Sequence, residues 1–187
     1  MKHLWVTLLV VGLAFLPGLA HATMVLYSPL PEMAKKSDLI VHALVTGQKV
    51  ARDESGRIKT YSTLQVLESV RGATKNEALN LSQVGGELDG ETAQVIGTSS
   101  FTVGEEVVLF GARMPDRVVM FAVGVGKYRV YSSAGQKYAI AEVGDVQLVK
   151  RKPEGGLESV KHPIPTAIPL SDFLQNVRNH VKTAGVK

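Results

Sequence analysis

The chain has 187 residues, a formal net charge of +4 and no cysteine. The lack of cysteine excludes disulfides, thiolate metal sites, thiol catalysis and a redox role for its own side chains. The basic residues are scattered except at positions 150–152, which argues against nucleic acid as a partner, because nucleic-acid-binding surfaces usually carry a clustered basic stripe.

Residues 1–22 predict a signal peptide. Lys2 and His3 form a short basic start, residues 4–16 are largely apolar, and Ala20 and Ala22 have the spacing of a signal-peptidase site. The alternative is a membrane anchor, but a spanning helix needs about 20 apolar residues and this run is shorter. We therefore expect export to the periplasm or the cell exterior, cleavage before Thr23, and no membrane insertion afterwards.

Residues 23–149 predict one all-β domain preceded by a short helix. The helix is expected at residues 30–36, with Pro31 near its start. Apolar and β-branched runs separated by turn sequences predict strands at residues 39–50, 58–70, 79–84, 92–96, 106–112, 117–123, 126–132 and 137–143. Short strands at this spacing are typical of a β-sandwich or β-barrel.

The last part of the chain predicts a linker and a helix. Residues 150–169 contain four prolines and two adjacent glycines, which is typical of an extended linker. Apolar residues at helical spacing then predict an amphipathic helix at residues 170–184, with Ser171 as its N-cap. An isolated helix of this length is marginal in water, so we expect its apolar side to pack on the barrel.

The sequence GGELDG at residues 85–90 is the candidate loop for contact with a partner. Its candidate residues are Gly85, Gly86, Glu87, Asp89 and Gly90. Glu87, Asp89 and Glu91 alternate as the ligands of calcium loops do, but such loops need further oxygen ligands that do not follow here. Phosphate-binding glycine motifs are also absent. We interpret the segment as a turn that needs positive φ angles and that meets a partner, and we expect no metal ion or other cofactor.

Catalysis has little support in the sequence. The three histidines after residue 22, His42, His162 and His180, lie far apart and match no zinc-binding spacing. No GxSxG motif is present, and no pair of carboxylates stands out. The strand tyrosines Tyr61, Tyr128, Tyr131 and Tyr138 have two interpretations, a stacking platform for single-stranded nucleic acid and ordinary packing, and we favour packing.

Four short motifs carry a resemblance to a known family. They are the segment 37–43 after the first helix, Arg71 with Gly72, the F-x-x-G-E segment at residues 101–105, and the apolar run 107–110. In this order they resemble the netrin-like, OB-fold-like module of the tissue inhibitors of metalloproteinases and of complement C-terminal domains. They are also similar to small exported bacterial proteins in which a GG-x-x-x-G stretch precedes F-x-x-G-E. The likeness spans residues 30–142 and implies a small β-barrel.

One departure limits what the resemblance implies for function. The metalloproteinase inhibitors act through a Cys-x-Cys start, whereas the segment after residue 22 here begins Thr23, Met24, Val25. We therefore expect a monomeric, exported, non-catalytic binding module with an unidentified protein partner. The alternatives are a protease inhibitor or accessory subunit of an exported enzyme and, with less support, a hydrolase of small substrates.

Overall fold

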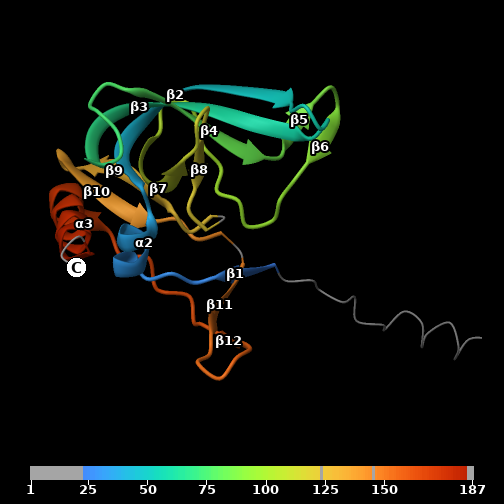
Figure 1. Ribbon diagram of the computed structural model, residues 1–187. Coiled ribbons are helices and arrows are strands. Elements are labelled where there is room, and N and C mark those ends of the chain that lie inside the picture. The colour runs from blue at the N-terminus through green and yellow to red at the C-terminus, as the bar shows by residue number, and fades with distance from the viewer. Residues whose placement is uncertain (1–22, 123, 145, 185–187) are drawn as a thin grey trace, which may run out of the picture.

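The computed structural model describes residues 23–122, 124–144 and 146–184 (Figure 1). The predicted signal peptide lies outside these residues. The elements are β1 Met24–Leu26, α2 Leu30–Lys36, β2 Leu39–Arg52, β3 Ile58–Arg71, β4 Ala78–Val84, β5 Gly86–Leu88, β6 Glu91–Ala93, β7 Glu106–Arg113, β8 Val118–Met120, β9 Lys127–Ser133, β10 Gln136–Ala141, β11 Gln147–Arg151, β12 Leu157–Ser159, β13 Ile168–Pro169 and α3 Leu170–Ala184.

Five strands close into a barrel in the order β2, β3, β4, β8, β7 and back to β2. All neighbours are antiparallel except β4 and β8, which pair in parallel at Leu81 and Val118. Numbered along the chain, the barrel strands follow the order 1-2-3-5-4, which is compatible with an OB-like fold. The predicted all-β barrel with a short N-terminal helix and a C-terminal helix is confirmed.

The first two barrel strands are long and bent. β2 and β3 each have 14 residues, and their pairing shifts register at three places, the last between Val45 and Gly47. Such bulges increase local twist and let a long strand curve around a barrel. The first half of β2 is buried on both faces and its second half is exposed, so only the second half presents side chains to solvent.

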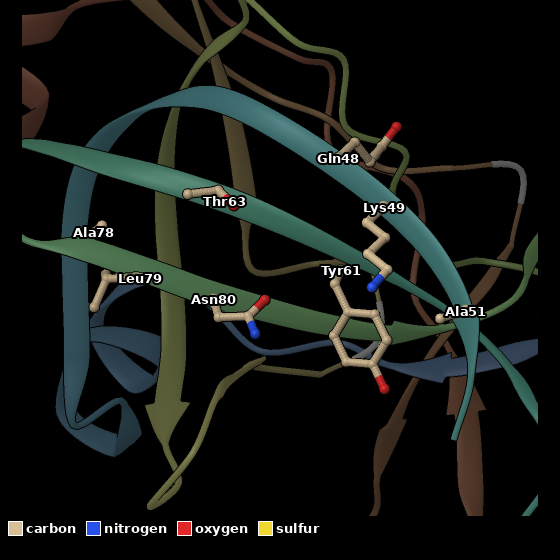
Figure 2. Close-up of a pocket in the computed structure, with 8 residues that line it drawn as sticks. All are labelled: Gln48, Lys49, Ala51, Tyr61, Thr63, Ala78, Leu79 and Asn80. Atoms are coloured by element: carbon tan, nitrogen blue, oxygen red, sulfur yellow. The ribbon is translucent and has the colours of Figure 1, made fainter. Parts of the chain in front are cut away.

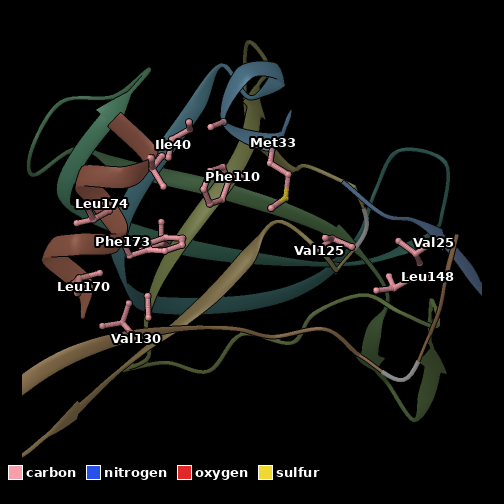
Figure 3. Packing of buried hydrophobic residues seen from close by; sticks show 14 of the residues in the cluster. Val25, Met33, Ile40, Phe110, Val125, Val130, Leu148, Leu170, Phe173 and Leu174 are labelled. Carbon is pink, nitrogen blue, oxygen red and sulfur yellow. The ribbon is translucent and has the colours of Figure 1, made fainter. Parts of the chain in front are cut away.

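Two apolar cores lie on opposite faces of the same strands. One fills the barrel and includes Leu39, Val41 and Leu109. The other lies outside the barrel, beneath the two helices, and includes Ile40, Met33, Phe110, Phe173 and Leu174 (Figure 3). Residues 107–110 alternate between these cores and are all fully buried, which explains why the run is apolar without interruption.

Helix α3 packs on the outer core, as its apolar spacing predicts. The Phe173 ring lies 4.5 Å from the ring of Tyr128 and 6.5 Å from that of Phe110, measured between centroids. The predicted N-cap is wrong, because the helix already begins at Leu170, directly after β13. Ser171 therefore lies in the first turn, where its hydroxyl bonds the carboxylate of Asp172 at 3.1 Å.

Three predicted segments differ from the structure. The strand expected at 117–123 is only Val118–Met120, because the chain then turns so that the Phe121 amide donates to the Phe110 carbonyl at 2.8 Å. The strand expected at 92–96 is Glu91–Ala93, and it pairs with β5, which the sequence did not predict. The segment 150–169 is not a continuous linker: a turn through Gly155 and Gly156, both at positive φ, returns the chain as β12 onto β11, and β13 pairs with β10.

Candidate functional site

An open groove of about 580 Å³ lies on the outer face of β2, β3 and β4 (Figure 2). Its lining residues come from the three adjacent strands and are Gln48, Lys49, Ala51, Tyr61, Thr63, Ala78, Leu79 and Asn80. Lys49 lies opposite Tyr61 in the strand register, and Thr63 lies opposite Asn80. Because side chains alternate along a strand, this register places all four side chains on one face of the sheet.

Several small residues lie on the groove face of the three strands. Gly47 pairs with Thr63 and has no side chain, and a Cβ built there would touch only Thr63, at 3.8 Å. Ala51 and Ala78, which line the groove, also contribute little bulk. The ring of Tyr61 stands beside the Lys49 side chain (Figure 2).

Three of the polar side chains in the groove are not used by the fold, whereas Gln48 is bonded to Ser62 and to the Phe101 carbonyl. Within the described residues, the side chains of Lys49, Tyr61 and Asn80 form no hydrogen bond or ion pair with the rest of the protein. Lys49 and Asn80 are exposed and Tyr61 is half-buried. These donors and acceptors are consequently available to a ligand.

A second hollow of about 590 Å³ continues from the groove to the loop 53–57 and the turn 114–117. Tyr61 lines both hollows. The loop 53–57 and the turn 114–117 form the rim of the groove. In this rim the Asp53 carboxylate accepts hydrogen bonds from Ser55 at 2.7 Å, Lys59 at 2.9 Å and Arg57 at 3.0 Å. The bonds from Ser55, Lys59 and Arg57 hold the pKa of Asp53 well below its usual range, so it stays ionised and fixes the loop.

The candidate loop 85–90 forms a β-hairpin. β5 and β6 pair around Asp89 and Gly90, which have φ angles of 54° and 79°. Two consecutive residues with positive φ are what a tight two-residue hairpin turn requires, and Asp-Gly is one of its preferred sequences. Gly85 and Gly86 also have positive φ, 111° and 136°, so the turn interpretation of the glycines is confirmed. Contact of this loop with a partner stays a prediction.

The hairpin is fastened to the barrel on the face of β2 and β3 opposite the groove. Thr60 donates from Oγ1 to the Gly85 carbonyl at 2.8 Å, and Arg52 forms an ion pair with Glu91 at 2.6 Å. A Cβ on Gly86 would lie 2.7 Å from Thr60 Oγ1 and 2.9 Å from Val50 Cγ1, so the backbone there approaches the sheet very closely. The glycines therefore position the hairpin as well as turn it.

The acids of the hairpin do not converge. Glu91 is engaged by Arg52, while Glu87 and Asp89 are exposed. Across residues 23–122, 124–144 and 146–184, no group of three or more histidine or carboxylate side chains is arranged to hold a metal ion.

A hollow of about 350 Å³ lies between the hairpin and the end of the barrel. Gln48 and Gln83 line it, and both donate to loop carbonyls, of Phe101 at 3.1 Å and of Ser99 at 2.9 Å. These amides hold the loop backbone in place, which leaves them without an evident chemical role.

The histidines are not brought together. His42 is buried on β2 and shares a hydrogen bond of 2.9 Å between its Nε2 and Glu106 Oε2, while Glu106 also accepts from Lys137 at 2.7 Å. Burial lowers the pKa of His42, and the bond to Glu106 opposes this only partly, so the imidazole is neutral at pH 7. His162 meets the Val146 carbonyl, and His180 lies on α3. The sequence held no sign of the contact between His42 and Glu106, which are 64 residues apart.

The tyrosines do not form one platform either. Tyr128 is packed in the outer core, where burial raises its pKa to about 12, and Tyr131 and Tyr138 stack on each other with centroids 5.8 Å apart. Only Tyr61 lines the groove. The packing interpretation is confirmed for Tyr128, and the sequence had no signal that separated Tyr61 from the others.

The residues that carry the family resemblance have structural roles. Lys127 is fully buried and forms ion pairs with Glu105 at 2.8 Å and Glu142 at 2.6 Å, and its ammonium lies 4.7 Å from the centroid of the Phe101 ring. Gly104 has a φ of 90° in the turn between Phe101 and Glu105. The F-x-x-G-E segment therefore supplies the partners of one buried cation.

The other motifs tie the helix α2 to the barrel. The guanidinium of Arg71 donates to the Ser37 carbonyl at 2.9 Å, and Asp38 Oδ1 accepts from the Arg113 amide at 2.8 Å. Gly72 has a φ of 78°, and a Cβ there would lie 2.1 Å from the Asp38 carbonyl oxygen, so no other residue fits. None of these residues lines the groove, and the resemblance accordingly informs the fold more than the site.

No protein-family model matches the chain, and no curated protein matches it in sequence. In the part of the chain that the structure describes, no helix is long and apolar enough to cross a membrane.

Proposed function

We propose that this chain is an exported, non-catalytic binding module with a netrin-like barrel, and that a protein partner contacts the groove on β2, β3 and β4. The observation that carries the proposal is the groove itself. It presents one aromatic ring and several polar groups that have no partner among the described residues, on a rigid sheet.

The chemistry of the groove suits a protein partner. Tyrosine is enriched in protein interfaces because its ring offers a large contact area at a small cost in conformational entropy. OB-type barrels bind oligonucleotides and oligosaccharides on the face of their second and third strands and on the flanking loops, so this region is a recurrent binding surface of the fold. In this chain these are β3, β4, the loop 53–57 and the turn 114–117, which together form the groove and its rim. The hairpin of residues 85–90 lies on the opposite face and reaches this rim through Arg52, where it would extend the contact.

Catalysis has less support than binding. Lys49 and Tyr61 are the titratable residues that line the groove, and no carboxylate or histidine accompanies them there. General acid–base catalysis needs titratable groups held at a defined position, and among the described residues neither side chain is held by a hydrogen bond or an ion pair.

Protease inhibition also has less support than general binding. An inhibitor that acts through its N-terminus needs that segment free to enter a cleft, whereas Met24, Val25 and Leu26 are paired with β11. If the chain is an accessory subunit of an exported enzyme, that enzyme is the protein partner and binds the same groove.

The test compares two tyrosine variants of the chain from Thr23 onward. Each protein is immobilised and exposed to exported proteins of the native host, and retained proteins are quantified by mass spectrometry. We expect at least one protein that wild type and Tyr131→Ala retain equally and that Tyr61→Ala retains about tenfold less, as for a hot-spot residue. Equal retention of every protein by wild type and Tyr61→Ala would contradict the proposal.

A further inference from the structure

The three-stranded sheet of β1, β11 and β12 has one covered face and one open face. It lies below the barrel in the view of Figure 1. Val25 and Leu148 lie opposite each other in the register and point into the outer core (Figure 3). Because side chains alternate, Met24 and Leu26 point the other way, toward solvent.

The open face carries three exposed apolar side chains. Met24 is 58% exposed, Leu26 45% and Leu157 49%. Val149 lies opposite Leu26 on the same side and is buried, and Gln147 and Ser159, which share a hydrogen bond of 2.7 Å, lie on this side as well. Large apolar side chains gathered on one exposed face mark an interaction surface more often than isolated ones do.

The same face has a basic border. Arg151 lies directly opposite Leu157 in the strand register, and Lys152 follows it in the turn. Lys161 and Ile164, which is 86% exposed, follow β12. Residues 147–164 contain four basic and two acidic residues, and one of the acids, Glu158, is already paired with Lys150 at 2.7 Å. The uncompensated charge of this corner is therefore positive.

We propose that this open face rests on the surface of an anionic phospholipid bilayer. Met24, Leu26 and Leu157 enter the headgroup region with their apolar side chains, and Arg151 and Lys152 contact lipid phosphates. Apolar burial combined with attraction to anionic lipids is how peripheral proteins bind an interface without spanning it. The complementary charge of an anionic bilayer selects lipid as the occupant of this face.

The face is separate from the groove, so the lipid contact and the protein contact of the proposed function are independent of each other.

Vesicle sedimentation tests the proposal. The helices and strands of the described residues lie within 24–184, so the chain from Thr23 onward is used without the apolar leader. We expect it to sediment with vesicles of phosphatidylcholine and phosphatidylglycerol, to remain in solution with phosphatidylcholine alone, and to be released by high salt. A chain that ignores both kinds of vesicle, because another protein or a second copy covers the face, would overturn the proposal.

Matched variants locate the contact. Each basic residue neutralised lowers partitioning about fivefold, so Arg151→Gln with Lys152→Gln lowers it about 25-fold. Leu157→Ser lowers it as well. The controls are Lys75→Gln with Lys182→Gln, which removes the same charge from exposed positions elsewhere, and Val103→Ser, at a residue that is 56% exposed. Equal losses in the control and test variants would show that binding is not at this face.

Discussion

Two titratable side chains are buried among the described residues, His42 and Lys127, and the protein treats them differently. Lys127 has two carboxylate partners, the Ser100 carbonyl and an aromatic ring, so its charge is compensated in place. His42 has one carboxylate partner, which is shared with Lys137, and the pKa of His42 is lowered by burial. A buried side chain whose charge is not fully balanced by its partners is more stable in its neutral form.

The lowered pKa of His42 predicts a pH dependence of stability. Below its unfolded value of 6.5 the unfolded chain binds a proton that the folded chain resists, so the free energy of unfolding falls as the pH drops from 7 through 6.5 toward the folded pKa. The slope is at most about 1.4 kcal/mol per pH unit. Urea unfolding at about pH 7.5 and about pH 5.5 should show this loss in wild type and a smaller one in His42→Gln.

The groups that face His42 act in a different pH range. Glu106 contacts it, Lys137 pairs with Glu106, and Glu68 lies opposite it on β3 and pairs with Arg178. Burial opposes the effect, but bonds from Lys137 and His42 hold the pKa of Glu106 below 4.5, so its contribution is lost only under more acidic conditions. An identical acid response in wild type and His42→Gln would contradict the assignment.

Leu109 provides a test of the barrel core. It is fully buried at the centre of β7. Leu109→Ala should lower the free energy of unfolding by about 2 to 5 kcal/mol, because it leaves a cavity between strands that cannot collapse. Denaturant titration measures this. A loss below about 0.5 kcal/mol, the range of surface substitutions, would mean that β7 is not central.

At the scale of elements, the hairpin of β5 and β6 depends on a few residues. Positive φ at Gly85, Gly86, Asp89 and Gly90 turns the chain, and two side chains of the barrel fasten it, Thr60 and Arg52. Glu87 and Asp89 are exposed, and neither forms a hydrogen bond or an ion pair within the described residues.

The hairpin predicts opposite results for its glycines and its acids. Gly86→Val should destabilise by roughly 1 to 3 kcal/mol, because it combines strained φ with contacts to Thr60 and Val50 below 3.0 Å. The double change Glu87→Gln with Asp89→Asn should leave stability within about 0.5 kcal/mol. Thermal melts of these variants and of wild type measure both effects.

The same melts address the cation alternative. We expect no calcium-dependent rise in the melting temperature of wild type, since a cation that binds only the folded state stabilises it by mass action. A rise of several degrees in wild type that is absent from the acid double variant would identify the hairpin as a cation site and refute the turn interpretation.

At the scale of the whole molecule, the two ends of the described chain meet on one core. Val25 of β1, Met33 of α2 and Phe173 of α3 belong to the same outer cluster, which shares β2 and β7 with the barrel core. The domain is therefore held together by packing across its full length, without disulfides.

Processing of the chain gives the prediction at this scale. Trp5 is the single tryptophan of the sequence and lies in the predicted signal peptide. Protein recovered from the native host should begin at Thr23 and show tyrosine fluorescence only. N-terminal sequencing and an emission spectrum test this, and tryptophan emission from the recovered soluble form would contradict cleavage before Thr23.

Local patterns determined the elements of this protein. Alternation and apolar runs placed β2, β3, β4, β7, β9 and β10, and helical spacing placed α2 and α3, because burial of one or both faces imposes a period on the sequence. The short strands β1, β5, β11, β12 and β13 escaped prediction. They have two to five residues, too few for a period to show, and pairing with a neighbour defines them.

The candidate site was decided by the tertiary structure. The glycines of residues 85–90 could be recognised in the sequence, because glycine is the residue that most readily adopts the positive φ angles found there. The groove depends on the register between three strands, which sets Lys49 beside Tyr61 and Thr63 beside Asn80. Register is fixed by bulges and by the closure of the barrel, both of which involve residues distant in the chain. For that reason the sequence alone determined the β-barrel class, and only the folded chain determined which of its polar residues face one another.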